Sequence, residues 1–274
     1  MSKWMLQKKV EKMPKLRDPV LIEGLPGMGQ VGKIAVDFLI DTMKPKLLYK
    51  IHSHDFWHSV YFNDEGFVEL PSIALYYSKG KTRDYLFLAG DDQPNTPRAS
   101  YEFSEKILDM AAELGCKEVV TLGGIGLASE VKVPKVFGAA TDKGVLDRYK
   151  KFSEIDFKLG KKVEAIVGAS GLLLGLARLR NMGGIALLSE TYGHPSHLGF
   201  KEAKSVLIQL KKITGMEVDL SELDKESAEY EKTQSKIKQD GESHDDVSGI
   251  TTTTTKLEKL KTQFTEKPDV HYIG

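Results

Sequence analysis

Apolar runs and helical patterns alternate along the chain from Val20 to Val218, and this alternation constrains the fold more than any other feature. Several apolar runs are continuous, as is typical of parallel strands that are covered on both faces. The alternation predicts an α/β fold, a three-layer α/β/α sandwich around a mostly parallel sheet. We expect strands at Val20–Glu23, Lys46–Ile51, Ile73–Tyr77, Tyr85–Ala89, Val119–Leu122, Val163–Val167 and Ile185–Ser189.

Helices are predicted between these strands, where apolar residues recur at helical spacing. Thr96 can cap the second helix, Pro97 suits its first position and Gly115 can end it. The predicted helices are Val31–Met43, Pro97–Leu114, Leu172–Met182 and Lys201–Ile213.

A β-hairpin interrupts this order, because Val60–Phe62 and Phe67–Val68 flank a four-residue turn that contains Gly66. The aromatic side chains around the hairpin offer more area than it can bury. We therefore expect the hairpin at the contact between copies of a closed homo-oligomer. Packing beneath the sheet is the alternative for these side chains. The interface candidates are Phe56, Trp57, Tyr61, Phe62 and Phe67.

The composition divides the chain into four parts. Residues 1–17 form an N-terminal extension and residues 18–220 form the α/β/α domain. Residues 221–255 carry many acids and few hydrophobic residues, which predicts an exposed helix and a low-complexity linker that add little to a core. We expect this flexible arm to be dispensable for stability. Residues 256–274 regain hydrophobic residues, so they are either a tail that binds a partner or a tail without a role.

Charge and cysteine content exclude several classes of protein. Lys plus Arg and Asp plus Glu number 39 each, so no net charge draws the chain to nucleic acid or to an acidic membrane. The single cysteine, Cys116, rules out an intrachain disulfide framework and suits a reducing compartment. The first residues resemble no secretory signal, and no run of about 18 apolar residues predicts a membrane span. We therefore expect a cytoplasmic protein.

The segment from Gly24 to Lys33 partly fits two phosphate-binding patterns. Gly27, Gly29 and Gly32 have the spacing of the dinucleotide fingerprint, but no acid lies at the end of the second predicted strand. The P-loop pattern fails because Ile34 follows Lys33, where a hydroxyl should bind magnesium. We favour a structural strand-to-helix turn, which also needs glycine.

Other candidate sites are incomplete. Asp91 and Asp92 follow a predicted strand and could bind a metal or act as a base, although turns rich in aspartate are commoner. Ser170 lacks the glycine that a hydrolase nucleophile has two positions later, so we expect it to cap a helix. His194 and His197 lie near Glu190 without a defined ligand spacing. The sequence therefore predicts no catalytic set, no metal and no cofactor.

Five motifs in order carry a family resemblance. Together they resemble the proteasome assembly chaperone family, subunit-two type, in its archaeal form, over residues 18–220. The motifs are Gly24-Leu-Pro-Gly-Met-Gly-Gln-Val-Gly32, Gly90-Asp-Asp-Gln-Pro94 with Tyr101, Thr121-Leu-Gly-Gly124, Gly168-Ala-Ser-Gly-Leu-Leu-Leu-Gly175 and Leu187-Leu-Ser-Glu-Thr191. Their positions of unassigned role are Gly27, Gly29, Gly32, Asp91, Asp92, Gln93 and Glu190.

The resemblance implies a sandwich similar to nucleoside phosphorylases without their chemistry. It implies an ATP-independent chaperone that is not an enzyme, and that holds proteasome α-subunits or the 20S core particle. It also implies self-association into a homo-oligomer, or pairing with a paralogous chaperone subunit. The alternative is an enzyme that binds a nucleotide or another small molecule at the Gly27–Gly32 loop, in line with an ATP-grasp-like label.

The last five residues resemble a docking tail of this family. Some relatives insert a tripeptide of a hydrophobic residue, tyrosine and any residue between α-subunits. Here Tyr272 is third from the end and follows His271, so the register differs by one. The tail therefore docks with a shifted register, binds another chaperone subunit or has no role. The partner-binding candidates are Val270, His271, Tyr272, Ile273 and Gly274.

Overall fold

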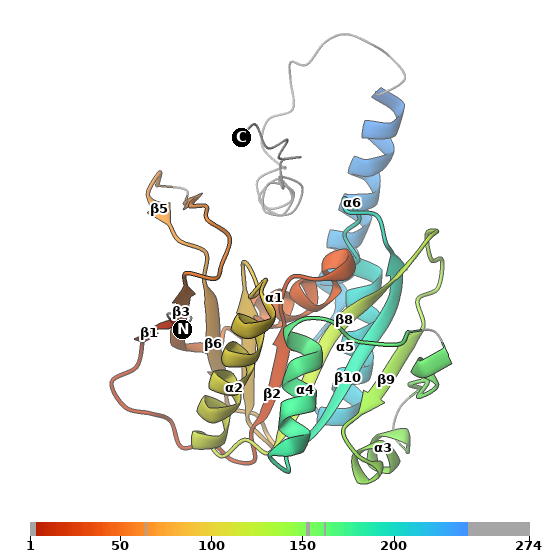
Figure 1. Cartoon of the computed structure of the whole chain (residues 1–274). Helices are drawn as coiled ribbons and strands as arrows, with labels where there is room; N and C mark the ends of the chain where they lie inside the picture. The colour runs from red at the N-terminus through yellow and green to blue at the C-terminus, as the bar shows by residue number, and fades with distance from the viewer. Residues whose placement is uncertain (1–3, 64, 152–153, 162, 241–274) are drawn as a thin grey trace.

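In a computed structural model, an eight-stranded mixed sheet with helices on both faces forms the body of the protein (Figure 1). The structure describes residues 4–63, 65–151, 154–161 and 163–240. Within this part, the strand order is β1-β3-β6-β7-β2-β8-β10-β9. The strands are β1 Trp4–Lys8, β2 Val20–Gly24, β3 Lys46–Ser53, β6 Ile73–Ser78, β7 Tyr85–Gly90, β8 Glu118–Leu127, β9 Val136–Ala140 and β10 Gly183–Tyr192.

The centre of the sheet is parallel and both its ends are antiparallel. Strands β7, β2, β8 and β10 pair in parallel, whereas β1, β3 and β6 join β7 through antiparallel pairings. At the other end, β9 pairs antiparallel with β10. The predicted hairpin is confirmed as a separate two-stranded sheet of β4 Tyr61–Phe62 and β5 Val68–Glu69.

The helices form two layers around the sheet. On one face lie α1 Val31–Met43 and α5 Phe200–Thr214, and on the other lie α2 Pro97–Glu113 and α4 Ala169–Leu179 (Figure 1). The short α3 Lys143–Lys150 lies beside β9 and β10, and α6 Ser221–Asp240 packs on α5. The single-turn helices are η1 Met28–Gln30 and η2 Leu159–Lys161. The predicted three-layer sandwich is therefore confirmed.

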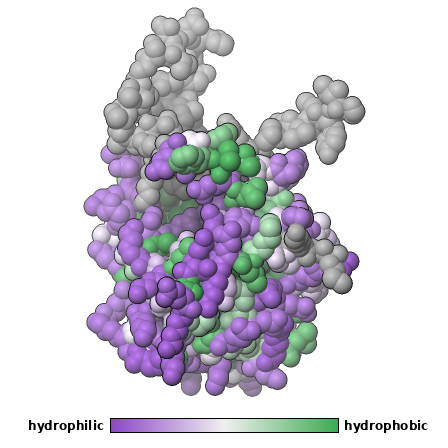
Figure 2. Space-filling model, turned by 90° about the vertical axis from the view of Figure 1, so that its left-hand side faces the viewer, coloured by the Kyte–Doolittle hydropathy of each residue, from purple (hydrophilic) through white to green (hydrophobic). Residues whose placement is uncertain are grey.

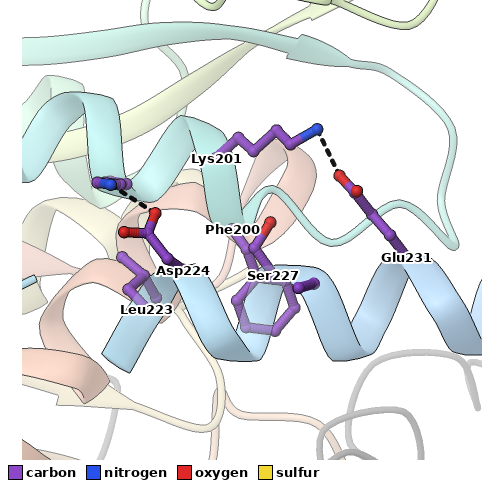
Figure 3. Close-up of a pocket in the computed structure, with 8 residues that line it drawn as sticks. Phe200, Lys201, Leu223, Asp224, Ser227 and Glu231 are labelled. Carbon is purple, nitrogen blue, oxygen red and sulfur yellow. Dashed lines mark hydrogen bonds and ion pairs between the residues drawn. The ribbon is translucent and has the colours of Figure 1, made fainter. Parts of the chain in front are cut away.

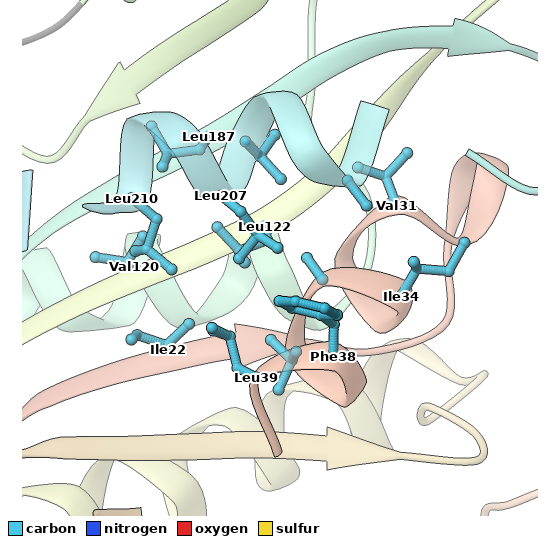
Figure 4. Packing of buried hydrophobic residues seen from close by; sticks show 14 of the residues in the cluster. Ile22, Val31, Ile34, Phe38, Leu39, Val120, Leu122, Leu187, Leu207 and Leu210 are labelled. Atoms are coloured by element: carbon cyan, nitrogen blue, oxygen red, sulfur yellow. The ribbon is translucent and has the colours of Figure 1, made fainter. Parts of the chain in front are cut away.

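Two hydrophobic layers hold the sandwich together. Neighbouring residues of β2 point to opposite faces, so Ile22 packs under α1 and α5 while Leu21 packs under α2 and α4. Figure 4 shows the first layer, where Phe38 and Leu39 of α1 meet the strands and the leucines of α5. Burial on both faces explains why the central strands are continuous apolar runs.

Most predicted elements lie where the sequence placed them. Helix α1 has its predicted bounds, and the side chain of Thr96 accepts a hydrogen bond from the Ala99 amide, as expected of a cap. Gly115 follows α2 with a φ of 83°, the left-handed conformation that favours glycine. The predicted cap at Ser170 is wrong, because α4 begins three residues earlier than predicted and Gly168 is its N-cap.

The predicted strand Val163–Val167 does not form. These residues lead into α4 without regular structure, and Val167 is 89% exposed. The position beside β10 that such a strand would take is occupied by β9, which the sequence analysis missed together with α3.

Part of the predicted N-terminal extension belongs to the sheet. Strand β1 forms one edge by pairing with β3. The Trp4 ring lies 5.8 Å from the Phe56 ring and 5.3 Å from the Phe103 ring of α2. The extension therefore contributes to the core instead of lying outside it.

The expectation that residues 221–255 add little to the core is wrong for the start of α6. Leu223 is 1% exposed and Tyr230 is 7% exposed, both within the α1–α5 layer. The Phe200 and Tyr230 rings lie 5.4 Å apart. Lys201–Glu231 and Lys204–Asp224 ion pairs join the two helices beside Phe200 (Figure 3). A cavity of about 210 Å³ remains between the two helices. Helix α6 is thus docked on the body at its start.

Removing Leu223 should destabilise the fold. We expect Leu223→Ala to lower the free energy of unfolding by about 2–4 kcal/mol, because it leaves a cavity under α6. Leu179→Ala makes the same chemical change at a side chain that is 79% exposed, and should cost no more than about 0.5 kcal/mol. Denaturant unfolding measures both, and equal losses would contradict the docking of α6.

Candidate functional site

The carboxyl ends of the parallel strands gather the sequence motifs at one edge of the sheet. Strands β2, β7, β8 and β10 all end at this edge, which we call the carboxyl edge. The loops that follow β2 and β7, the end of β8 and the start of α4 therefore meet there. Open α/β folds commonly bind ligands at this position.

The glycines around the β2–α1 loop allow the backbones to approach closely. A Cβ atom on Gly24 would lie 2.1 Å from the Gly32 carbonyl oxygen, and one on Gly32 would lie 2.2 Å from the Leu122 carbonyl oxygen. Because both neighbours are backbone atoms, neither glycine can be replaced without moving α1 away from β2 and β8. This supports the structural-turn interpretation of the segment.

The next turn of the loop packs against β8 and β10. Gly29 has a φ of 60°, and a Cβ there would lie 2.4 Å from the Thr191 hydroxyl oxygen. The Gly199 amide donates to the Gly29 carbonyl oxygen at 2.8 Å, which ties the loop to the β10–α5 connection. By contrast, a Cβ on Gly27 would meet nothing closer than 3.9 Å. The glycine spacing is therefore explained by packing at every position except Gly27.

Lys33, the lysine of the incomplete P-loop, is buried on α1. Its ammonium group lies 2.8 Å from the Asp37 carboxylate, one turn along the same helix. A P-loop lysine instead extends to the phosphates across the turn. An ion pair with Asp37 and 4% exposure leave Lys33 poorly placed for that role.

The Asp91-Asp92-Gln93 motif joins three parts of the carboxyl edge. Asp91 accepts hydrogen bonds from the amide and the hydroxyl of Ser72, directly before β6. Asp92 accepts from the Trp57 amide at 2.6 Å, which anchors the segment leading to the hairpin. Gln93 donates to the Pro26 carbonyl and accepts from the Ala169 amide. These contacts give the motif a structural role in a turn.

Glu23 is a fully buried carboxyl group under the start of α4. One carboxyl oxygen accepts from the Leu25 amide and the Ser170 hydroxyl, at 3.1 and 3.2 Å. The other has no hydrogen-bond partner among the described residues, and neither does the hydroxyl of Thr121, its register partner on β8. The pKa of Glu23 is raised to about 7, because burial raises it more than the hydrogen bonds from Ser170 and Leu25 lower it. Glu23 was not among the residues predicted from sequence, because a single acid in an apolar strand carries no motif.

The histidines near the end of β10 make local contacts. His197 lies 3.0 Å from the Glu202 carboxylate, and His194 contacts the Ser196 hydroxyl at 2.8 Å. Glu190 is buried on β10, and its amide donates to the Lys135 carbonyl. In the part of the chain that the structure describes, no three His, Cys, Asp or Glu side chains are grouped closely enough to hold a metal ion.

Exposed hydrophobic side chains concentrate at the carboxyl edge. Of the large exposed ones among the described residues, only Leu6, Leu179 and Ile208 lie elsewhere. Figure 2 shows a hydrophobic patch at the top of a mostly hydrophilic side of the molecule, the side that carries the hairpin. The edge residues are Met28, Trp57, Val60, Phe62, Phe67, Val68, Leu70, Tyr101, Val133 and Val167.

The five aromatic interface candidates differ in exposure. Phe62 and Phe67 are 74% and 64% exposed, Trp57 is 40% exposed and Tyr61 is half-buried. The candidacy of Phe56 is wrong, because it is 7% exposed and packs edge-on against Trp4 in the core. The tail candidates from Val270 to Gly274 lie outside the described residues.

The comparisons with known proteins agree with this architecture. The PAC2 family model matches residues 21–238. The chain belongs to the PAC2 family.

Two relatives share about a third of their residues with this PAC2 protein. The crystal structure of Pyrococcus furiosus PbaB, described as an archaeal proteasome activator, is 34% identical with a TM-score of 0.80, covering 87% of this chain and all of PbaB. An uncharacterized protein from Methanocaldococcus jannaschii is 33% identical, over 85% of this chain and 88% of its own length. These matches confirm the predicted resemblance to archaeal proteasome assembly chaperones.

A third similarity supports the fold alone. Pyrococcus furiosus PbaA, described as an archaeal homolog of proteasome-assembly chaperone, is 22% identical with a TM-score of 0.71. It covers 94% of this chain, and this chain covers 98% of it. Across the described residues, none of the helices is both long and apolar enough to cross a membrane.

The glycine packing can be tested with two alanine substitutions. Gly32→Ala should lower the free energy of unfolding by about 3 kcal/mol or more, because its Cβ would collide with the Leu122 carbonyl. Gly27→Ala is the matched control and should stay within about 0.5 kcal/mol of the parent, since its Cβ has room. Guanidinium unfolding measures both values. Similar losses for the two variants would contradict the packing explanation.

Glu23 should make stability depend on pH. Its pKa is raised above the ordinary 4.5 in the folded state, so its contribution is complete below about pH 4.5 and is lost as pH rises through about 7. Between about pH 4.5 and 8, the difference in unfolding free energy between the parent and Glu23→Gln should change by roughly 3 kcal/mol. Glu113→Gln, an exposed change on α2, should follow the parent at every pH. A constant difference between the parent and Glu23→Gln would show that Glu23 is ionised throughout.

Proposed function

We propose that this PAC2 protein is a proteasome assembly chaperone that binds proteasome α-subunits, or the assembled 20S core particle, through its carboxyl edge. The observation that carries the proposal is the concentration of exposed hydrophobic side chains at that edge. Exposed apolar patches with polar surroundings commonly mark protein interfaces. PbaB, which is 34% identical, is described as a proteasome activator.

The position of α6 also supports the carboxyl edge as the binding face. Helix α6 begins beside the first half of α5, where Asp224 pairs with Lys204. It then passes the amino end of α5, where the Tyr230 hydroxyl accepts from the Leu198 amide, and projects beyond the carboxyl edge (Figure 1). The chain therefore leaves α6 on the side where the hairpin also projects. A tail that continues from this point can bind the same partner as the edge, which raises its effective concentration there.

Within this proposal, the tail from Val270 to Gly274 binds the proteasome through Tyr272. An amphipathic tyrosine is a frequent binding hot spot, because it buries a large ring and keeps a polar end. The one-residue shift from the family tripeptide leaves a second possible partner, a paralogous chaperone subunit. Docking on the proteasome is the choice that we propose.

We further propose that the hairpin takes part in self-association. Phe62 and Phe67 lie on its exposed surface, at the tip of a two-stranded sheet that is separate from the body. Burying these rings between copies would remove apolar surface from water, at about 25 cal/mol per Å². Light scattering should therefore find a homo-oligomer at micromolar concentration, and a monomer there would contradict this part of the proposal.

Binding should need neither ATP nor magnesium. The glycines of the β2–α1 loop are used for packing and Lys33 is paired with Asp37, which supports a loop without a nucleotide role. Calorimetry with ATP and magnesium should detect no binding at millimolar concentration. Micromolar binding that Gly27→Val abolishes would favour the nucleotide-binding alternative, since this exposed glycine has room for a side chain.

Binding to purified α-rings tests the proposed function. The double variant Val133→Asp with Val167→Asp should weaken binding at least tenfold, about 1.4 kcal/mol, because it places charges in the apolar patch outside the hairpin that we assign to self-association. Tyr272→Ala and deletion of the last three residues should each weaken binding by a similar factor. Leu179→Asp, an exposed change at the other end of the body, is the matched control and should bind like the parent.

The variants separate the two parts of the proposal. If only the tail variants lose affinity for α-rings, the tail is the binding element and the carboxyl edge is not. Equal affinity for the parent and all variants would overturn both parts. Surface plasmon resonance at physiological salt, with and without ATP, gives these affinities.

A further inference from the structure

A groove opens beside α1, on the face of the sheet that α1 and α5 cover. Its volume is about 490 Å³, and we call it the α1–β6 groove. Side chains of α1 form one wall, and Leu47 of β3 with Ala74 and Tyr76 of β6 form the floor. Further lining residues come from the loop after β7, the hairpin and α6, namely Asp91, Glu69 and Glu226.

The groove exists because the sheet is wider than the helix layer on this face. Helix α1 packs over β7, β2 and β8, and α5 packs over β10 and β9. Strands β3 and β6 lie beyond α1, and Leu47, Ala74 and Tyr76 are only partly buried there. Within the described residues, these three side chains thus form an apolar floor that is open to solvent.

Negative charge surrounds this apolar floor. The lining includes five carboxylates, from Asp37, Asp41, Glu69, Asp91 and Glu226, and two ammonium groups, from Lys33 and Lys50, that pair with Asp37 and Glu69. Five negative and two positive charges leave the lining with a net charge of −3. Burial raises the pKa of the Tyr76 hydroxyl, and the negative charges of Asp37, Asp91 and Asp41 raise it further. The groove therefore suits a segment that is both apolar and basic.

The chain itself contains such a segment in residues 256–264, outside the described residues. Lys256, Lys259 and Lys261 outnumber its single acid, Glu258. Its hydrophobic residues Leu257, Leu260 and Phe264 recur at intervals of three and four, the spacing of one helix face. Both its charge and its apolar pattern complement the groove.

The intervening chain has a suitable length. Glu226 of α6 lines the groove, and the helix continues from there to Asp240. At 1.5 Å per residue, the end of α6 is about 21 Å farther along its axis. Residues 241–255 are rich in Gly, Ser and Thr, and a linker of this composition and length has a root-mean-square span of about 19–23 Å. The linker thus matches the distance back to the groove.

We propose that residues 256–264 bind in the α1–β6 groove of the same chain. The bound segment would hold the last ten residues against the body, beside the carboxyl edge. A partner that binds Tyr272 would then compete with the groove for the tail, so the contact is autoinhibitory. The contact itself lies within one chain and is tested without a partner, whereas its autoinhibitory effect rests on the proposed binding of the tail to the proteasome.

Distance measurement between two spin labels tests this contact in the full chain. Lys44→Cys places one label beside the groove, because the Lys44 side chain is exposed and lies against Asp41 of the groove wall. Gln263→Cys places the other label on the segment. Cys116 is 3% exposed, so it stays unlabelled in the folded protein. Doubly labelled chains are diluted into an excess of unlabelled chains, so that only distances within one chain are detected. We expect a narrow short-distance population in most chains.

Charge reversal on either side should remove this population. Lys256→Glu with Lys259→Glu and Lys261→Glu should lower the ratio of bound to unbound segment at least about tenfold, and Asp41→Lys on the groove wall should also lower it. Glu113→Lys makes the same charge change on α2, on the opposite face of the sheet, and should leave the ratio unchanged. Circular dichroism checks that each variant keeps its fold.

Three results would overturn the proposal. The first is the absence of a short-distance population in the parent chain. The second is a population that the lysine reversals leave unchanged. The third is a short distance that disappears when labelled chains are diluted with unlabelled ones, because the segment would then bind a second copy.

Discussion

The close contact between α1 and the strands beneath it determines the arrangement of the rest of the molecule. Gly24 and Gly32 let the helix backbone approach β2 and β8, with no space for even one methyl group on either residue. This contact fixes the β2–α1 loop at the carboxyl edge, where Gly29 packs on Thr191 and Gln93 bonds to Pro26. A nucleotide fingerprint and a tight structural turn use the same glycines, and here packing accounts for all of them except Gly27.

The same contact supports our proposal that the carboxyl edge binds a protein partner. The β2–α1 loop packs against the sheet, and Lys33 forms an ion pair with Asp37. The motifs that resemble enzyme sites form hydrogen bonds between neighbouring loops. The hydrophobic side chains of the hairpin and the adjacent loops are left exposed around them. A scaffold of this kind can bind a large partner without chemistry of its own.

The sequence alone predicted the sandwich because its strands are buried on both faces and its helices have regular apolar stripes. It failed where a side chain's role depends on distant parts of the chain. The run Val163–Val167 has strand composition, but β8 and β9 occupy the positions on the two sides of β10. Phe56 belongs to an aromatic cluster in sequence, yet Trp4 covers it.

Leu223 and Tyr230 lie in a segment of acidic composition, and only α5 provides the surface on which they pack. The buried Glu23 and the groove beside α1 likewise arise from tertiary packing.

Hydrogen exchange measured with and without purified 20S core particle tests the central claim, that the carboxyl edge is the binding face. The account predicts slower exchange of backbone amides in residues 57–70 and 128–135, which carry exposed hydrophobic side chains at that edge. Exchange in α3, which lies at the opposite end, should not change (Figure 1). Protection confined to α3 and the amino ends of the strands, with none at the hairpin, would contradict the account.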